Sequence, residues 1–376
     1  MKNEQYLFKN IEDKTITWFG KNNRYVVVEN ITADIIKSIA NEKPIEDIVN
    51  ELLEQIEAPK NEIKDFILNL KKQFFSNSEK KESINKYEKN NLPLEFEHIN
   101  YYKVNNIVFK VSYFSEKELS LIHPKFSHLQ VDKIRNVNHH FQVFINDNIV
   151  FLYVDSNFIG SWSPENVHYF QGKFSMELIQ KVHQKEEDKW LGIFHASAIS
   201  NGEKSILFLG DSGNGKSTSL ALLQSHGFTC LADDFVPIDA KKQEVYSFPA
   251  GISIKKNSLK TLLPIYPELA TTAEYDFKRL NKIVRFLKPN NSDFTSHLPC
   301  KDLVFIKYEK DAELRFEKIS KIEAFQNLVP DSWLSPIKEN ASIFLDWFST
   351  LHCYQLVYSK NQEMINQVEK LFSDDI

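Results

Sequence analysis

The first 75 residues alternate between β-prone runs and apolar positions at helical spacing. Two β-prone runs, 16–19 and 25–28, flank the polar segment 20–23, which predicts a hairpin. Apolar residues then recur every three to four positions in three segments, which begin after Thr32, at Pro44 and after Pro59. The pattern predicts a small α+β unit, a hairpin followed by three amphipathic helices, over residues 1–75.

Three further regions follow from the same pattern. Few apolar side chains occur in the first part of 76–93, and this composition predicts a solvated linker. Residues 94–190 are rich in strand patterns, with candidate strands at 107–111, 141–145 and 149–154. Strands and helices alternate over residues 191–376, which predicts an α/β core.

Composition narrows the class of protein. The chain has 376 residues, of which 42% are hydrophobic and 26% charged, so a disordered or fibrous protein is excluded. Its net charge of −5 gives no basic excess, and we expect no nucleic-acid partner. Apolar runs are too short for a membrane helix, and no signal-peptide pattern opens the chain, so we expect a cytoplasmic protein without a membrane partner. Three widely spaced cysteines predict buried, reduced thiols.

A phosphate-binding motif stands out against a background of ten glycines in the whole chain. The pattern GxxxxGK[ST] is met by Gly210, Asp211, Ser212, Gly213, Asn214, Gly215, Lys216, Ser217 and Thr218. A buried-type strand, 205–209, precedes it and a helical segment follows it. Backbone N–H groups of such a loop surround phosphate oxygens, the lysine contacts the β and γ phosphates, and Ser217 is the expected Mg²⁺ ligand. We therefore expect ATP and Mg²⁺ as cofactors.

Two adjacent carboxylates come soon after this loop. Asp233 and Asp234 end the short strand 228–232, which we expect to run parallel to 205–209 with its carboxyl end beside the loop. One of the two carboxylates can hold Mg²⁺ through water, while its neighbour accepts a proton from an attacking hydroxyl. A turn or a helix cap is the structural alternative for the pair.

A histidine upstream is predicted to reach the same place. Asn201-Gly202 is a strong two-residue hairpin signal between the β-prone segments 193–199 and 204–209. With that turn His195 lies opposite Phe208, two residues before Gly210. Arg279 and Arg285 are weaker candidates for a phosphate clamp.

Residues 195–235 resemble the HPr kinase/phosphorylase family, whose catalytic domain is similar to the phosphoenolpyruvate carboxykinase fold. The resemblance is carried by His195 and the two residues after it, by the phosphate loop, and by 231–234. It implies that Asp234 is the general base, that His195 assists at the reacting phosphoryl group and that Lys216 stabilises its charge. Asp233 is then left as the carboxylate on the metal side. The family's further metal-binding glutamate has no counterpart, because 248–253 contain no acid.

The N-terminal unit is similar in pattern to PqqD-like domains, winged-helix-type elements that recognise ribosomally synthesised precursor peptides. The resemblance implies that an extended leader peptide adds as a strand to the hairpin edge. A helical packing or dimerisation element is the alternative, and a homo-oligomer is compatible with either.

Together these observations predict an α/β protein, α+β overall: a PqqD-like domain (1–75), a linker (76–93), a β-rich segment (94–190) and an HPr kinase-like P-loop domain (191–376). The predicted activity is ATP- and Mg²⁺-dependent phosphorylation of a hydroxyl, a Ser of a precursor peptide in first place. The alternatives are a kinase of a small molecule or carrier protein, and a nucleotide-sensing regulator or scaffold without catalysis. A DNA-binding regulator is disfavoured by the acidic second helix.

Overall fold

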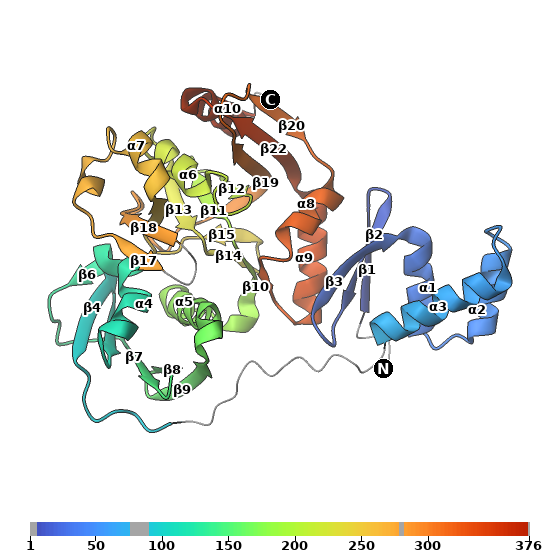
Figure 1. Ribbon diagram of the computed structural model, residues 1–376, viewed down its shortest axis with the longest axis horizontal. Coiled ribbons are helices and arrows are strands. Elements are labelled where there is room, and N and C mark those ends of the chain that lie inside the picture. The colour runs from blue at the N-terminus through green and yellow to red at the C-terminus, as the bar shows by residue number, and fades with distance from the viewer. Residues whose placement is uncertain (1–5, 76–89, 278–281, 375–376) are drawn as a thin grey trace.

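The computed structural model of the chain describes residues 6–75, 90–277 and 282–374 (Figure 1). Over these ranges the protein is a mixture of sheets and helices, α+β overall, as the sequence predicts. The predicted linker falls largely outside the described residues, which include only its last part, 90–93. No helix in the described part of the chain has the length and apolar character needed to span a membrane.

The N-terminal unit is a three-stranded antiparallel sheet with three helices. Its elements are β1 (Tyr6–Ile11), β2 (Lys14–Phe19), β3 (Arg24–Glu29), α1 (Asn30–Ala40), α2 (Ile45–Leu53) and α3 (Lys60–Phe75), with the strands in the order β1-β2-β3. The predicted hairpin is β2-β3, and three helices follow it as the apolar spacing predicts. Helix α1 begins at Asn30, so Thr32 lies inside the helix and does not begin it. Strand β1 was not predicted, because Lys9 and Asn10 interrupt its apolar pattern.

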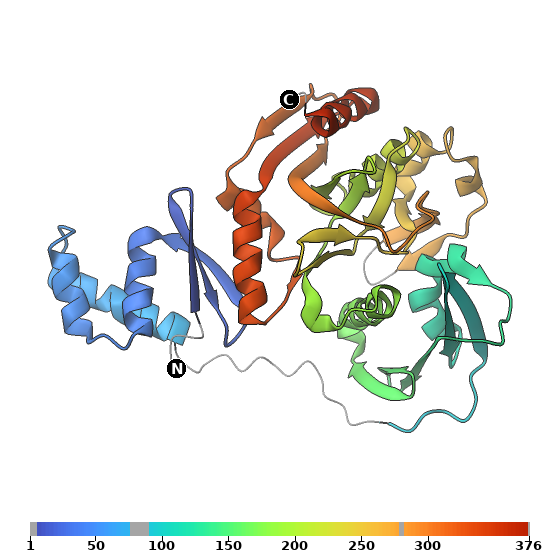
Figure 2. The same cartoon turned by 180° about the vertical axis from the view of Figure 1, so that it is seen from behind.

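The N-terminal sheet lies between its own helices and two helices of the C-terminal region, α8 (Lys321–Leu328) and α9 (Lys338–Thr350) (Figures 1 and 2). Ile11 and Ile16 belong to the same buried cluster as Phe325 and Phe344. The Tyr25 ring packs edge-on against Phe325 and Phe344, with centroids 6.0 and 5.5 Å away. The N-terminal sheet is therefore packed against the C-terminal region and is not merely tethered to it through the chain.

The middle region is a six-stranded sheet with two helices packed on it. Its elements are β4 (His98–Val104), β5 (Ile107–Tyr113), α4 (Glu116–Phe126), β6 (Gln130–Val131), β7 (His139–Asn146), β8 (Ile149–Val154), β9 (Asn157–Trp162) and α5 (Val167–His183), in the strand order β6-β4-β5-β7-β8-β9. Gly251 N donates to Lys125 O at 2.7 Å, which joins this region to the C-terminal one.

The C-terminal region is built on a ten-stranded sheet. Its strands are β10 (Trp190–Phe194), β11 (Ser197–Ser200), β12 (Ser205–Leu209), β13 (Thr229–Asp233), β14 (Val236–Asp239), β15 (Glu244–Tyr246), β19 (His297–Tyr308), β20 (Arg315–Lys318), β21 (Trp333–Leu334) and β22 (His352–Tyr358). A three-stranded sheet of β16 (Ile252–Lys255), β17 (Tyr275–Phe277) and β18 (Lys282–Leu287) lies beside it, together with α6 (Lys216–Gln224), α7 (Leu259–Leu262) and α10 (Asn361–Ser373). All three cysteines are buried and free, as predicted.

Strand β13 is separated from β12 by one strand. The order is β13-β11-β12, and β11 pairs antiparallel with both neighbours. Strands β12 and β13 therefore run in the same direction, as predicted, with β11 between them. This arrangement brings the ends of β13 and β12 and the start of β11 to one edge of the sheet.

The predicted register of the β11–β12 hairpin is wrong by two residues. Ser197, not His195, pairs with Phe208, and the ladder closes at Ser200 opposite Ser205. The turn has four residues instead of two, because the Asn201 side chain accepts hydrogen bonds from the N–H groups of Glu203 and Lys204, both at 3.0 Å. An Asx turn of this kind competes with the tight Asn-Gly turn. Continued beyond β11, the observed register brings His195 level with Gly210.

Candidate active site

The phosphate motif forms a loop between the buried strand β12 and helix α6. Gly210, Gly213 and Gly215 have φ values of 133°, 110° and 100°, which glycine adopts at little cost. At Gly210 a Cβ atom would also lie 2.8 Å from the carbonyl oxygen of Ile306, so a side chain there is excluded. The loop is held to β19 by the bond from Tyr308 N to Asn214 O at 2.9 Å.

The lysine of the motif lies over its own loop. Lys216 is 6% exposed, and its ammonium donates to the carbonyl oxygen of Gly210 at the start of the loop. Behind it, the hydroxyls of Ser219 and Tyr358 are 2.8 Å apart and tie the first turn of α6 to β22. The ammonium is therefore held where the first loop residues and the N-terminus of α6 meet, a place that favours anions.

Asp233 is a buried carboxylate with three hydrogen-bond donors. Its Oδ1 accepts from the Ser197 and Ser217 hydroxyls at 2.6 and 3.1 Å, and its Oδ2 accepts from Ser253 N at 3.0 Å. Burial, followed by the negative charge of Asp234, raises the pKa of Asp233 to about 6, although the three hydrogen bonds oppose the shift. The contact with Ser217 joins this acid directly to the phosphate motif.

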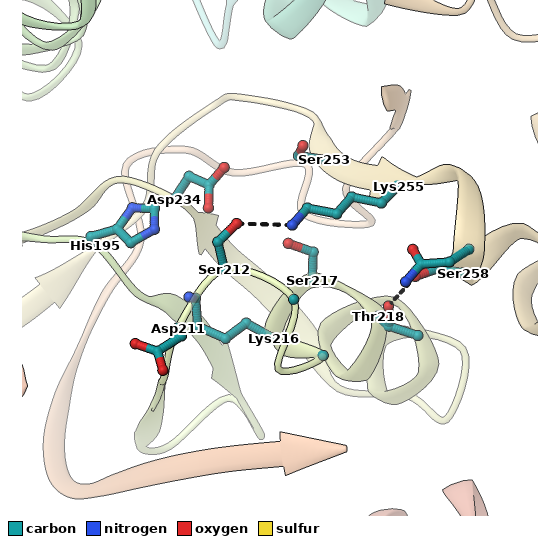
Figure 3. A pocket seen from close by; sticks show the side chains of 13 residues that line it. His195, Asp211, Ser212, Lys216, Ser217, Thr218, Asp234, Ser253, Lys255 and Ser258 are labelled. Atoms are coloured by element: carbon teal, nitrogen blue, oxygen red, sulfur yellow. Dashed lines mark hydrogen bonds between the residues drawn. The ribbon is translucent and has the colours of Figure 1, made fainter. Parts of the chain in front are cut away.

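Asp234 and His195 lie side by side at one end of the cavity in front of the loop (Figure 3). Asp234 has φ 62°, a left-handed conformation that is uncommon for a residue other than glycine and that recurs at functional sites. The Asp234 carboxylate borders the cavity (Figure 3). His195 lies in the break between β10 and β11, and it is exposed.

Every residue of the predicted site borders this cavity except Gly210, Asn214 and Asp233. Its lining includes His195, Asp211, Ser212, Gly213, Gly215, Lys216, Ser217, Thr218 and Asp234. Asp233 lies beneath it, bonded to Ser217. Gly210 and Asn214 border a second cavity, which shares His195 and Asp211 with the first.

Sequence reasoning missed the wall opposite the loop, which comes from β16 and the residues after it. Ser253, Lys255, Asn257 and Ser258 line the cavity there. The Lys255 ammonium donates to the Ser212 hydroxyl at 2.8 Å, and the hydroxyls of Ser258 and Thr218 are 2.7 Å apart. Only Ser253 of these residues belongs to the segment 248–253, which contains no acid. Alternation along β16 could have placed Ser253 and Lys255 on one face.

The two arginine candidates do not complete the site. Arg285 donates to the carbonyl oxygens of Leu269 and Ala270 and lies 3.5 Å from Glu274, so it has a structural role on β18. Arg279 lies outside the described residues. Lys216 and Lys255 are therefore the cations that border the cavity in the described part of the chain.

The oxygen atoms of Ser217 and Asp233 fit a magnesium ion, which prefers oxygen ligands and keeps several of its waters. No cluster of three or more His, Cys, Asp or Glu side chains suited to a metal occurs among the described residues. A metal at Ser217 and Asp233 would therefore take its other ligands from phosphate and water.

Comparisons with known proteins give likenesses to solved structures but no family. No protein-family model matches the chain, and no curated protein matches it either. Among solved structures, the Hpr(Ser) kinase/phosphatase from Coxiella burnetii aligns over 49% of this chain and 95% of its own, with 10% identity and a TM-score of 0.22. A score this low does not establish a shared fold, so the function has to be argued from the site.

Proposed function

We propose that this protein is a kinase that transfers the γ-phosphoryl group of ATP to a hydroxyl, with Mg²⁺ as the metal. The support is a single cavity that combines a phosphate loop, its lysine, a serine–aspartate pair fit for Mg²⁺, and a second aspartate beside a histidine. The resemblance of residues 195–235 to HPr kinases suggests the same chemistry.

In the proposed reaction the acceptor oxygen attacks the γ-phosphorus, and the bond from that phosphorus to the bridging oxygen breaks, so that ADP leaves with the electron pair. Asp234 takes the hydroxyl proton, because its carboxylate lies in the cavity beside the phosphate loop. Lys216 and the loop N–H groups stabilise the phosphate charge, and His195 assists at the reacting group. Mg²⁺ held by Ser217 and Asp233 would neutralise further phosphate charge.

The proposed acceptor is a Ser of a ribosomally synthesised precursor peptide whose leader binds the N-terminal unit. Among the described strands β3 pairs only with β2, so one edge of β3 is available for an added peptide strand. The resemblance to PqqD-like domains suggests this mode of recognition. A carrier protein or small molecule as acceptor would use the same catalytic residues.

The decisive variant is Asp234→Asn, which keeps the size of the side chain and removes its basicity. We expect phosphoryl transfer to fall at least 100-fold (about the contribution of a general base), while ATP binding changes little. Transfer is measured by mass spectrometry of precursor peptides encoded beside the gene, and binding by calorimetry. Asp311→Asn is the matched control, since Asp311 has the same left-handed backbone (φ 62°) as Asp234 but is exposed and lines neither this cavity nor its neighbour. Equal transfer in both variants would contradict the role of Asp234.

The second candidate function is a nucleotide-sensing regulator in which no phosphate moves. The absence of an acid in 248–253 favours it, because a kinase of the HPr type has a further metal-binding glutamate there. Nucleotide binding without ADP formation, in the presence of every precursor peptide offered, would support this function over the kinase.

A further inference from the structure

A second cavity lies beside the one that holds the phosphate loop. It has a volume of about 300 Å³, within the range of ligand sites, and it shares His195 and Asp211 with the first cavity. Its other walls are the end of β19, Gln355 of β22 and helix α8. A molecule in it would therefore lie against the same histidine that borders the phosphate site.

The orientation of a bound triphosphate decides which reactant this cavity receives. In phosphate loops the lysine contacts the β and γ phosphates. Lys216 reaches the carbonyl of Gly210 at the start of the loop, so the γ end belongs near Gly210 and Asp211. The nucleoside end then belongs near Thr218 and Ser258, on the far side of the first cavity. The second cavity borders the γ end, where an acceptor has to approach.

The lining of the second cavity suits a peptide segment. Its floor is apolar, formed by Leu209, Phe305 and Leu328, which are 4%, 9% and 2% exposed. Asn327 of α8 and Gln355 add side-chain amides, groups that can hydrogen-bond an extended main chain.

The charged groups at the rim are mainly acidic. Glu323 and Asp331 are exposed and have no ion-pair partner among the described residues, whereas Lys307 is paired with Glu309 at 2.8 Å. A basic side chain next to the acceptor hydroxyl would meet these two carboxylates.

The N-terminal unit contacts helix α8, which forms one wall of this cavity. Glu12, in the turn between β1 and β2, accepts hydrogen bonds from the Ser320 hydroxyl at 2.6 Å and from Lys321 N at 2.8 Å. It thereby caps the N-terminus of α8, the helix that carries Glu323 and Asn327 into the cavity. A peptide whose leader is bound to the N-terminal sheet would have its following segment close to this opening, at a high effective concentration.

We propose that the second cavity is the acceptor site and that it selects a peptide segment with a basic side chain next to the hydroxyl-bearing residue and an apolar one on the floor. This proposal rests on the kinase function proposed above. It adds Glu323 and Asp331 as specificity residues and Asn327 as a residue that contacts the acceptor.

The test compares two short synthetic peptides without a leader, identical except that the Ser is followed by Lys in one and by Glu in the other. With the full-length protein we expect a KM roughly tenfold lower for the Lys peptide, as for one charge-assisted contact. Glu323→Lys combined with Asp331→Lys should reverse this preference and leave the ATP dissociation constant unchanged. Glu317→Lys is the control, because Glu317 is exposed on β20 and does not line the cavity.

Two further measurements separate the outcomes. Asn327→Trp fills the opening from an exposed position and should raise the KM for peptide without changing ATP affinity. If it weakens ATP binding instead, the cavity holds the purine base and the proposal is wrong. Peptide binding, measured by fluorescence anisotropy with a non-hydrolysable ATP analogue, needs no transfer and so distinguishes a failed kinase from a failed acceptor site. An equal affinity for both peptides, or none for either, would contradict the proposal.

Discussion

Lys255 is the residue of the candidate site that the sequence did not suggest and whose role is clearest from its contacts. It lies on β16 across the cavity from the phosphate loop, and its ammonium bonds to Ser212 at 2.8 Å. In the proposed complex with ATP, this ammonium would contact phosphate oxygens directly and neutralise part of their charge.

We expect Lys255→Met to weaken ATP binding roughly tenfold, the effect of losing one charge-assisted contact, and to weaken ADP binding less. The difference arises because Lys255 reaches Ser212, close to the γ end of the loop. Lys256→Met is the matched control, since Lys256 is exposed and does not line the cavity. Calorimetric titrations with both nucleotides check this, and an equal loss for the two would place Lys255 at the nucleoside end.

The phosphate loop and the two aspartates of the candidate site could be identified residue by residue, because each is defined by residues that are adjacent in the sequence. The motif Gly210 to Thr218 determines its own conformation through three positive-φ glycines. The contacts of Asp233 with Ser197 and Ser253 were not predictable, since they join strands that are far apart in the sequence. The left-handed backbone of Asp234 carries no sequence signal of its own, because aspartate tolerates that conformation without requiring it.

At the scale of elements, two half-buried histidines, His128 and His183, join the middle region to the segment that leads into β16. The ring of His183, at the end of α5, lies 2.8 Å from the carbonyl oxygen of Ser247, and His128 hydrogen-bonds the backbone at Pro249. Burial lowers the pKa of each to about 4. Both imidazoles are therefore neutral in the folded protein at neutral pH.

We expect the contacts of His128 and His183 to contribute less to the free energy of unfolding in acid. Between pH 6.5 and 4 the unfolded chain binds protons at these histidines that the folded chain does not, so the free energy of unfolding falls as the pH drops through this window. Each histidine can account for roughly 3 kcal/mol. Urea denaturation at several pH values should show the loss, and His183→Gln, which keeps a donor for Ser247, should reduce it by about half.

The exposed His168, on the same helix α5, provides the control for this measurement. His168→Gln should leave the pH dependence as it is in the wild type. An unchanged acid response in His183→Gln would show that the loss of stability originates elsewhere in the protein.

Element prediction succeeded where periodicity decided the structure and failed where side chains competed with the backbone. The three N-terminal helices follow their apolar spacing, whereas the β11–β12 turn is set by the side chain of Asn201. The displaced register moved His195 from a position opposite Phe208 to the level of the loop itself. The order of the strands in the sheet could not be predicted either, because the residue pattern of a strand does not indicate that β11 lies between β12 and β13.

At the scale of the whole molecule, the packing of the N-terminal sheet against α8 and α9 was beyond sequence reasoning. A buried face looks the same in sequence whether its partner is in the same unit or in another one. The arrangement matters for experiments, because deleting residues 1–80 would expose Phe325 and Phe344 as well as remove a recognition unit. Peptides with and without a leader therefore test recognition more cleanly than a truncated protein does.

The proposed function requires that one cavity binds ATP and passes its γ-phosphoryl group to a hydroxyl on a peptide. The most direct measurement counts ADP and phosphopeptide in the same reaction, with Mg-ATP, the full-length protein and the precursor peptides encoded beside its gene. We predict one ADP for each phosphopeptide, and the loss of both products in Lys216→Ala. ADP formation without any phosphopeptide, or equal product formation in Lys216→Ala, would contradict the account.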